Sequence, residues 1–257
     1  MAAVLELNNV SKKFGGLTAV NNVSLCLSQG EILNIIGPNG AGKTTLFNCI
    51  TGIYRPSEGR ISMPGRDVRI DGFPPHRMAE LGIARTFQNI RLFANMSVLD
   101  NVLCGAFCRT EESILDIVFR TTKFKMAETS VNSRARELLK FVDLSDKLYI
   151  NGSSLSYGDQ RRLEIARALA LEPGLLLLDE PAAGMNASET NALAALIRKI
   201  RDKGTALLII EHDMRFVMEI SDRIVVLNYG EKISEGVPEA VRNDKKVIDA
   251  YLGEGDQ

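Results

Sequence analysis

The fold is decided by the stretch Gly37-Pro-Asn-Gly-Ala-Gly-Lys-Thr44, which fits the phosphate-loop pattern G-x-x-x-x-G-K-[ST]. An apolar predicted strand, Glu31–Ile36, precedes it, and Lys43–Ile50 follows with helical character. Glycines let the backbone curl so that successive N–H groups point at phosphate oxygens, and the helix start adds its positive dipole. The sequence therefore predicts a nucleotide-binding loop between a strand and a helix.

Two side chains of this loop carry chemistry. Lys43 would place its charge on the β- and γ-phosphates, and the Thr44 hydroxyl would ligate Mg²⁺. The residues expected to bind ATP here are Gly37, Pro38, Asn39, Gly40, Ala41, Gly42, Lys43, Thr44 and Thr45. A phosphate loop alone fits kinases, GTPases and many ATPases, so other features have to decide the class.

A second feature is the acidic end of an apolar stretch, Leu175-Leu-Leu-Leu-Asp179-Glu180-Pro181. An apolar strand that ends in two carboxylates places the first, Asp179, beside a metal ion at the carboxyl edge of the sheet. The second, Glu180, can polarise a water molecule in line with the γ-phosphate. Solvated acids at the end of a buried strand give the same pattern, but the upstream phosphate loop favours the catalytic interpretation.

The stretch that decides the class is Leu155-Ser-Tyr-Gly-Asp-Gln-Arg-Arg162. Ser156 and the Gly158 backbone lie at the start of a predicted helix, Gln160–Leu171, where they can donate to an anion. Here the chain resembles the ATP-binding cassette family, whose signature is similar to L-S-G-G-Q and stands just ahead of the acidic strand. The resemblance implies that Ser156 and Gly158 contact the ATP held by a partner's phosphate loop, so that two chains enclose two nucleotides.

Further elements of the family occur in the expected order. The resemblance implies that Phe14 stacks on adenine, and that Gln88, in Arg85-Thr-Phe-Gln-Asn89, senses Mg²⁺ and the γ-phosphate. It also implies that His212, which follows the predicted strand Ala206–Ile210, reaches the γ-phosphate. The expected catalytic residues are thus Glu180, His212 and Gln88, and the expected Mg²⁺ ligands are Thr44, Gln88 and Asp179.

Three positions depart from the family pattern. The segment Ala183-Gly-Met-Asn186 takes the place of the dimer-contacting loop but differs from the common S-A-L-D form. Tyr157 replaces the first glycine of the signature, which is acceptable if its φ stays below zero. Asp159 replaces the usual glutamine and puts a carboxylate near the partner's nucleotide, unless it is paired with Arg161 or Arg162. We expect no ligand role for Asp159.

Strands and helices alternate along most of the chain, which is typical of a mainly parallel sheet. From about residue 89 the strand signals fade, and helical stretches take over at Val98–Cys108, Ile114–Arg120 and Glu128–Val142. We therefore predict an α/β fold of the P-loop NTPase class, one cassette domain over 1–257. It would comprise a RecA-like core (about 1–88 and 160–257), an N-terminal antiparallel β layer that includes Glu6–Val10 and Val23–Leu27, and an inserted helical subdomain (about 89–159).

Composition restricts the class of function. The chain has 31 basic and 32 acidic residues, and this net charge of −1 argues against a general nucleic-acid partner. No apolar run reaches the roughly 18–20 residues that span a bilayer, and no secretory signal is visible, so we expect a cytoplasmic chain. The four cysteines are interpreted as free thiols rather than a metal site: Cys26, Cys49, Cys104 and Cys108.

Within the family, the chain is most similar to LivG-type ATPases of bacterial branched-chain amino-acid importers. The stretches that carry this resemblance are Phe14–Asn22, Arg85–Phe93, Tyr157–Ile165 and Ala250–Glu254. It implies an ATP hydrolase, peripheral on the cytoplasmic face of a bacterial inner membrane, that energises uptake of leucine, isoleucine and valine. The implied partners are a second, LivF-like ATPase (or a second copy in isolation), two transmembrane permease subunits and, indirectly, a periplasmic substrate-binding protein.

Other functions stay open at this point. Related cassettes serve urea, amides or other amino acids, and the lipopolysaccharide-export ATPase ends in a similar Tyr-Leu-Gly-Glu, although the Glu211-His212 pair favours the importer. A cassette that acts on ribosomes or DNA usually has two cassettes on one chain or a long coiled coil, and neither is visible. A P-loop kinase or GTPase would leave the signature and His212 without a role, and no N-K-x-D guanine-binding motif is present.

Overall fold

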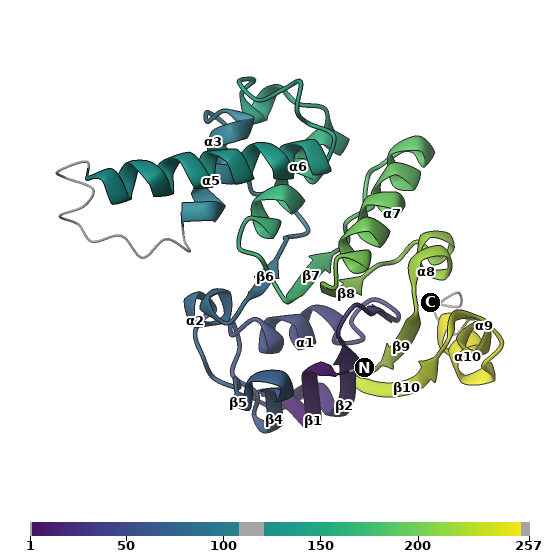
Figure 1. The fold of residues 1–257 in the computed structure, drawn as a ribbon. Coiled ribbons are helices and arrows are strands. Elements are labelled where there is room, and N and C mark those ends of the chain that lie inside the picture. The colour runs from purple at the N-terminus through teal and green to yellow at the C-terminus, as the bar shows by residue number, and fades with distance from the viewer. Residues whose placement is uncertain (1, 108–120, 253–257) are drawn as a thin grey trace. The chain divides into compact units, whose positions relative to one another are not determined.

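The computed structural model of the chain describes residues 2–107 and 121–252 (Figure 1). It divides into two compact units, which we call the core unit (Met1–Gln88 with Gly174–Gln257) and the helical unit (Asn89–Pro173). The first boundary lies where the sequence suggested it, after Gln88. The second lies after Pro173, whereas the sequence suggested residue 159.

The main sheet of the core unit has six strands in the order β10-β9-β3-β8-β7-β6. The pairs that involve β3, β6, β7 and β8 are all parallel, and only β10 runs antiparallel to its neighbour β9. All residues of β3, β7 and β8 are buried, as expected for strands that are covered on both faces. The strands are β3 (Ile32–Ile36), β6 (Ile83–Arg85), β7 (Leu175–Asp179), β8 (Ala206–Ile210), β9 (Arg223–Asn228) and β10 (Glu231–Gly236).

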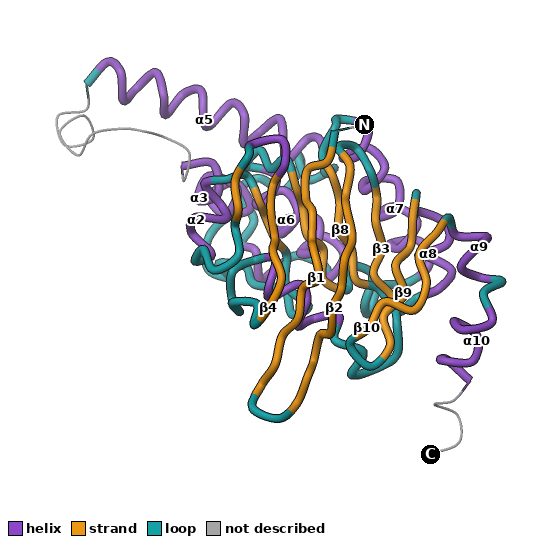
Figure 2. The backbone as a smooth tube through the Cα atoms, turned by 90° about the horizontal axis from the view of Figure 1, so that it is seen from below, coloured by secondary structure: helices purple, strands orange, loops and turns teal. Residues whose placement is uncertain are grey.

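The second sheet is antiparallel, in the order β2-β1-β4-β5, and forms the N-terminal layer that the sequence predicted. Figure 2 shows β1 and β2 as a long hairpin. Apolar side chains of this sheet share one buried core with α1 and with one face of the main sheet. The strands are β1 (Ala3–Phe14), β2 (Leu17–Ser28), β4 (Glu58–Met63) and β5 (Val68–Arg69). The α/β architecture with an antiparallel N-terminal layer that the sequence predicted is thereby confirmed.

The two longer or motif-linked helices of the core unit are α1 (Lys43–Ile50), which the sequence predicted over the same residues, and α7 (Ala187–Asp202). Four others, of five to eight residues, were not predicted, because such short segments barely display a helical period and no motif marks their start as the phosphate loop marks that of α1. Two of these begin at a proline, a residue that is favoured at the first helical position. The four are α2 (Pro75–Glu80), α8 (Met214–Ile220), α9 (Pro238–Arg242) and α10 (Lys245–Leu252).

The helical unit contains α3 (Val98–Phe107), α5 (Thr122–Phe141) and α6 (Tyr157–Leu169), which pack on one another. Helices α3 and α6 approach closely, since a Cβ atom on Gly105 would lie 2.5 Å from the carbonyl oxygen of Arg167. The predicted helix Ile114–Arg120 and the thiol of Cys108 lie outside the described residues. Within the described ranges, none of the helices combines the length and the apolar character that crossing a bilayer requires.

Candidate nucleotide-binding and catalytic site

The loop between β3 and α1 needs its glycines for backbone reasons. Gly37 and Gly42 have φ values of +147° and +94°, which residues with a side chain rarely adopt. A Cβ atom on Gly37 would lie 2.0 Å from the carbonyl oxygen of Leu227, and one on Gly42 would lie 2.3 Å from that of Ala19. Glycine therefore lets this loop lie directly against β9 and β2, at the carboxyl edge of the main sheet.

Lys43, the first residue of α1, has its charge held inside this loop. Its Nζ donates to the carbonyl oxygens of Gly37 (2.6 Å) and Pro38 (2.7 Å), and the side chain is buried. Gly42, the N-cap of α1, has no side-chain acceptor for the first-turn N–H groups. Thr44 is exposed, and Thr45 is half-buried. The start of α1 thus combines a cation with N–H groups that suit an anion.

Asp179 ends β7 and is anchored at the same edge of the sheet. Arg85, the last residue of β6, donates from Nη2 to Asp179 Oδ2 at 2.7 Å, and both side chains are nearly buried. Its Nη1 donates to Asn48 Oδ1 on α1, also at 2.7 Å. Among the described residues, no group of three or more His, Cys, Asp and Glu side chains is gathered that could hold a metal by itself. A cation here would need further ligands in addition to Asp179.

The three residues expected to be catalytic meet at one carboxylate. Glu180 follows Asp179 with a φ of +47°, which turns the chain after β7. Gln88 Nε2 donates to Glu180 Oε2 at 2.9 Å, and His212 Nε2 lies 2.7 Å from Glu180 Oε1. These residues follow β6, β7 and β8, whose carboxyl ends lie side by side in the sheet. A carboxylate oriented at both oxygens is suited to accept a proton from a water molecule.

Glu211 is a part of this site whose role sequence reasoning missed. Its Oε1 accepts from the backbone N–H of Ala182 at 2.7 Å, and its Oε2 accepts from the N–H of His212 at 3.0 Å. Burial raises the pKa of Glu211, although backbone donors from Ala182, His212 and Asp213 act in the opposite direction. The sequence feature that could have indicated this role is the position of the Glu211 carboxylate, directly after the apolar stretch Ala206–Ile210. Glu211 joins the loop after β7 to the loop that carries His212.

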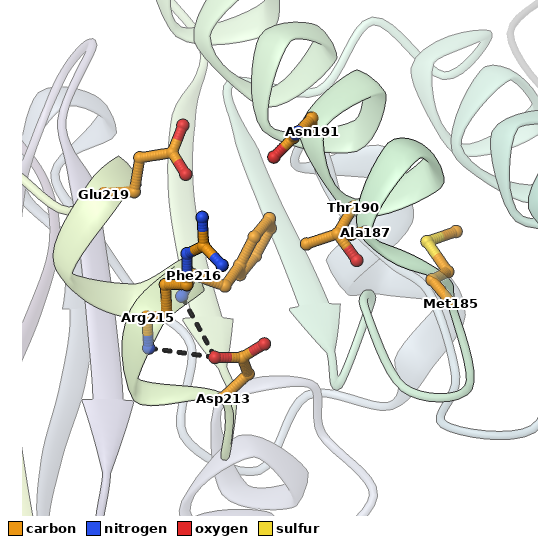
Figure 3. A pocket seen from close by; sticks show the side chains of 8 residues that line it. All are labelled: Met185, Ala187, Thr190, Asn191, Asp213, Arg215, Phe216 and Glu219. Atoms are coloured by element: carbon orange, nitrogen blue, oxygen red, sulfur yellow. Dashed lines mark hydrogen bonds between the residues drawn. The ribbon is translucent and has the colours of Figure 1, made fainter.

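Asp213 begins α8 on the other side of His212. Its Oδ1 accepts from the N–H groups of Arg215 (2.9 Å) and Phe216 (3.2 Å), which Figure 3 shows as dashed lines. A pocket of about 210 Å³ lies between α7 and α8 next to this cap. Its lining residues are Met185, Ala187, Thr190, Asn191, Asp213, Arg215, Phe216 and Glu219. Met185 belongs to the segment Ala183–Asn186, which the family resemblance aligns with a dimer-contacting loop, and this pocket therefore adjoins that segment.

Phe14 ends β1, and its side chain is partly exposed. Its ring centroid lies 5.2 Å from that of Tyr54 in an edge-to-face arrangement, and Lys12 Nζ lies 5.0 Å from the centroid. These neighbours hold the ring, and its exposed part remains available for stacking.

In the helical unit, the signature forms the start of α6. Ser156 is the N-cap, and its Oγ accepts from the N–H of Asp159 at 3.3 Å. Tyr157 is not among the residues with positive φ, so it meets the condition set for replacing glycine. Gly158 is buried in the first helical turn. The N-terminus of α6 is thereby formed as an anion-binding site would require.

Asp159 is turned into the helical unit and paired there. Its carboxylate bonds Lys147 Nζ at 2.6 Å and also the Arg162 guanidinium, whereas Arg161 pairs with Glu164 at 2.9 Å. Burial opposes ionisation of Asp159, but the bond from Lys147, the charge of Arg162 and the Ser156 contact together lower its pKa. The sequence left open whether Asp159 pairs with Arg161 or Arg162, and the structure shows that it pairs with Arg162.

The fold and this set of motifs define a P-loop ATPase of the cassette class. Residues 20–183 match the family model described as ABC transporter, and residues 231–257 match that of the branched-chain amino acid ATP-binding cassette transporter. The structure is similar to the ADP conformation of an ATP-binding cassette of an ABC transporter, with a TM-score of 0.84 and 33% identity, covering 98% of this chain and 100% of that one.

Similar proteins of known name indicate which type of cassette ATPase this chain resembles. The chain is 46% identical to the high-affinity branched-chain amino acid transport ATP-binding protein LivG of Salmonella typhimurium and 44% identical to BraF of Pseudomonas aeruginosa. Both matches cover 98% of either chain. Identity to the lipopolysaccharide export system ATP-binding protein LptB of Haemophilus influenzae is 33%, over the same share of both chains. The chain belongs to the ABC transporter family, as an ATPase of the branched-chain amino-acid transporter type.

Proposed function

We propose that this chain hydrolyses ATP to energise a multi-subunit importer for branched-chain amino acids, namely leucine, isoleucine and valine. The similarity to LivG and BraF over nearly the whole length, at 46% and 44%, supports this cargo over lipopolysaccharide, for which the relative LptB is 33% identical. The carboxyl-terminal match over residues 231–257 points the same way. It also supports this cargo over urea or other amides.

The observation that carries the proposal is the contact of Gln88 and His212 with the two oxygens of Glu180. In this proposal Glu180 is the general base that takes a proton from the attacking water. His212 orients Glu180 and contacts the γ-phosphate. Gln88 contacts both Glu180 and the metal, and it directly precedes Asn89, the first residue of the helical unit. Lys43 and the N–H groups of the loop from Gly37 to Thr45 bind the phosphates.

The donor set beside this base fits Mg²⁺. The Asp179 carboxylate, the Thr44 hydroxyl and the Gln88 amide are hard oxygen donors, and Mg²⁺ is usually held by one or two carboxylates plus phosphate oxygens and water. When bound, the ion would neutralise charge that develops on the β- and γ-phosphates. Asp179 is already fixed by Arg85, so its orientation does not depend on the metal.

A second cassette would complete each nucleotide site. In this proposal Phe14 stacks on adenine, while Ser156 and Gly158 of the facing protomer contact the γ-phosphate through the start of α6. The partners are a LivF-like ATPase or a second copy of this chain, two permease subunits and, through them, a periplasmic substrate-binding protein. The chain would then lie on the cytoplasmic face of a bacterial inner membrane.

The test uses the complex with both permeases, reconstituted in vesicles together with the binding protein. The Glu180→Gln variant should keep ATP affinity but lose about 100-fold to 10,000-fold in hydrolysis rate, because the general base is gone, and leucine uptake should stop. Glu80→Gln, an exposed carboxylate on α2, serves as the matched control and should leave both rates unchanged. Wild-type hydrolysis by the Glu180 variant would refute the base assignment, and ATP-driven uptake of urea instead of leucine would refute the cargo.

A further inference from the structure

Arg85 is a nearly buried cation at the end of β6, and the proposed function assigns it no part in binding the metal. Its side chain is 10% exposed. One arm, Nη2, donates to Asp179 Oδ2 at 2.7 Å. The other arm, Nη1, donates to Asn48 Oδ1 at 2.7 Å and to Thr51 Oγ1 at 3.2 Å. The guanidinium therefore joins the end of β7 to the last turns of α1, the helix that starts at the phosphate loop.

Aromatic rings complete the surroundings of this guanidinium. Its Cζ lies 5.4 Å from the ring centroid of Phe87 and 5.8 Å from that of Phe47. Within the part of the chain that the structure describes, Arg85 Nε is buried without a hydrogen-bond partner. A charge so removed from water depends on the carboxylate that it faces, so the Arg85–Asp179 pair is fixed rather than loosely formed.

Arg85 bonds only one of the two carboxylate oxygens of Asp179. Arg85 takes Oδ2, and no other described side chain bonds the carboxylate, so Oδ1 remains for a further ligand. Outer contacts of this kind orient metal-binding carboxylates and raise metal affinity. Arg85 also directly precedes the segment Thr86–Gln88, which brings a second expected metal ligand to the same edge of the sheet.

We propose that Arg85 is a positioning residue for the magnesium ion: it holds Asp179 by one oxygen so that the other is presented to the metal. This inference rests on the proposed function. Lysine would be a poor substitute, because its ammonium donates from a single point, whereas the planar guanidinium presents separate arms to Asp179 and Asn48. A purely structural role for Arg85 would instead stabilise β6 and α1 and leave metal binding unchanged.

The experiment separates these roles by measuring metal binding and not turnover. A fluorescent ATP analogue is titrated onto the Glu180→Gln protein in EDTA and then with increasing Mg²⁺, and Mn²⁺ occupancy is measured by electron paramagnetic resonance. Adding Arg85→Met should weaken Mg²⁺ and Mn²⁺ binding about 10-fold to 100-fold, while affinity for the analogue in EDTA stays the same. Arg85→Lys should give a smaller loss. Arg77→Met, which removes an exposed arginine of α2, is the matched control and should change neither.

Each outcome decides the matter. Unchanged metal affinity in a folded Arg85→Met protein would overturn the inference, as would an equal loss of analogue affinity with and without metal. Should Arg85→Met fail to fold, Arg85→Lys and Asn48→Ala carry the test, and unchanged metal binding in both would refute it. Failure of the parent protein to bind the analogue, or to respond to Mg²⁺, would instead contradict the proposed function, whatever the Arg85 variants do.

Discussion

Asp159 shows how a single unusual residue in the signature is accommodated. Replacing it with asparagine should lower the free energy of unfolding of the helical unit by about 1.5–3 kcal/mol at pH 7, because the contacts with Lys147 and Arg162 lose their charge assistance. The pKa of Asp159 is lowered below 3.8 in the folded chain. Its stabilisation should therefore be complete above that pH and be lost as the pH falls through the lowered value.

Urea unfolding at a series of pH values from 7 downward checks this prediction. The exposed Asp146 of the same unit provides the control variant, Asp146→Asn, which should change stability little. A variant at position 159 as stable as the parent at pH 7, or a difference that grows as the pH is lowered below 3.8, would contradict the account.

At this scale the structure brings the predicted residues Gln88, Glu180 and His212 together, but the sequence indicated only some of the partners that hold the site. The choice of Arg162 over Arg161 follows from helix geometry, since residues three apart share a face and residues two apart do not. Lys147 and Arg85 could not be assigned in this way. Their contacts join elements distant in the chain, and no local pattern records such contacts.

At the scale of elements, two loops of the site depend on one carboxylate. Substituting Glu211 by glutamine should lower the free energy of unfolding by about 1–3 kcal/mol, because the N–H groups of Ala182 and His212 face different carboxylate oxygens, and one of these becomes an amide nitrogen that faces a donor. The loop after β7 would then separate from the loop after β8. We expect ATP hydrolysis to fall as well, since His212 would no longer be held against Glu180.

Chemical denaturation and steady-state hydrolysis together measure this effect. Glu219→Gln, on an exposed face of α8, is the control and should leave both quantities near the parent's values. A Glu211→Gln protein with parental stability and turnover would show that the two loops are held by other contacts.

Element lengths were the less predictable part of the fold. Strands β1 and β2 have 12 residues each, whereas their alternating patterns predicted only five apiece. The register shifts around Val10, and Asn9 and Asn22 have positive φ, so the inward-facing positions change along the hairpin. Strand β6, with three residues, is too short for any period to be visible.

At the scale of the whole molecule, the position of α6 explains the difference between the predicted and observed units. The predicted boundary at about residue 159 assigned most of this helix to the core. In the structure it packs on α3 across Gly105, where a side chain would clash with the backbone of Arg167. Such close packing between helices depends on where they meet in space, which the sequence of α6 alone does not show.

The proposed shared site makes a prediction for pairs of molecules. Two variants in the Glu180→Gln background are needed. Lys43→Ala removes the positive charge that would face the phosphates, and Ser156→Arg blocks the start of α6. Each alone should fail to form the ATP-dependent dimer expected of the parent, because both of its nucleotide sites are damaged. A mixture should recover dimers, since the intact phosphate loop of one chain then meets the intact signature of the other.

Sedimentation velocity with and without ATP distinguishes this geometry from a site contained in one protomer. Circular dichroism establishes that Ser156→Arg keeps α6, which loses about 1 kcal/mol of capping energy with the serine. Ser154→Arg, two residues earlier in an exposed turn, shows whether bulk near the signature is enough to block association. If ATP is bound wholly within one chain, mixing supplies no complementary half and no dimer appears. Recovery in the mixture alone requires that the phosphate loop and the signature act on one triphosphate from opposite chains.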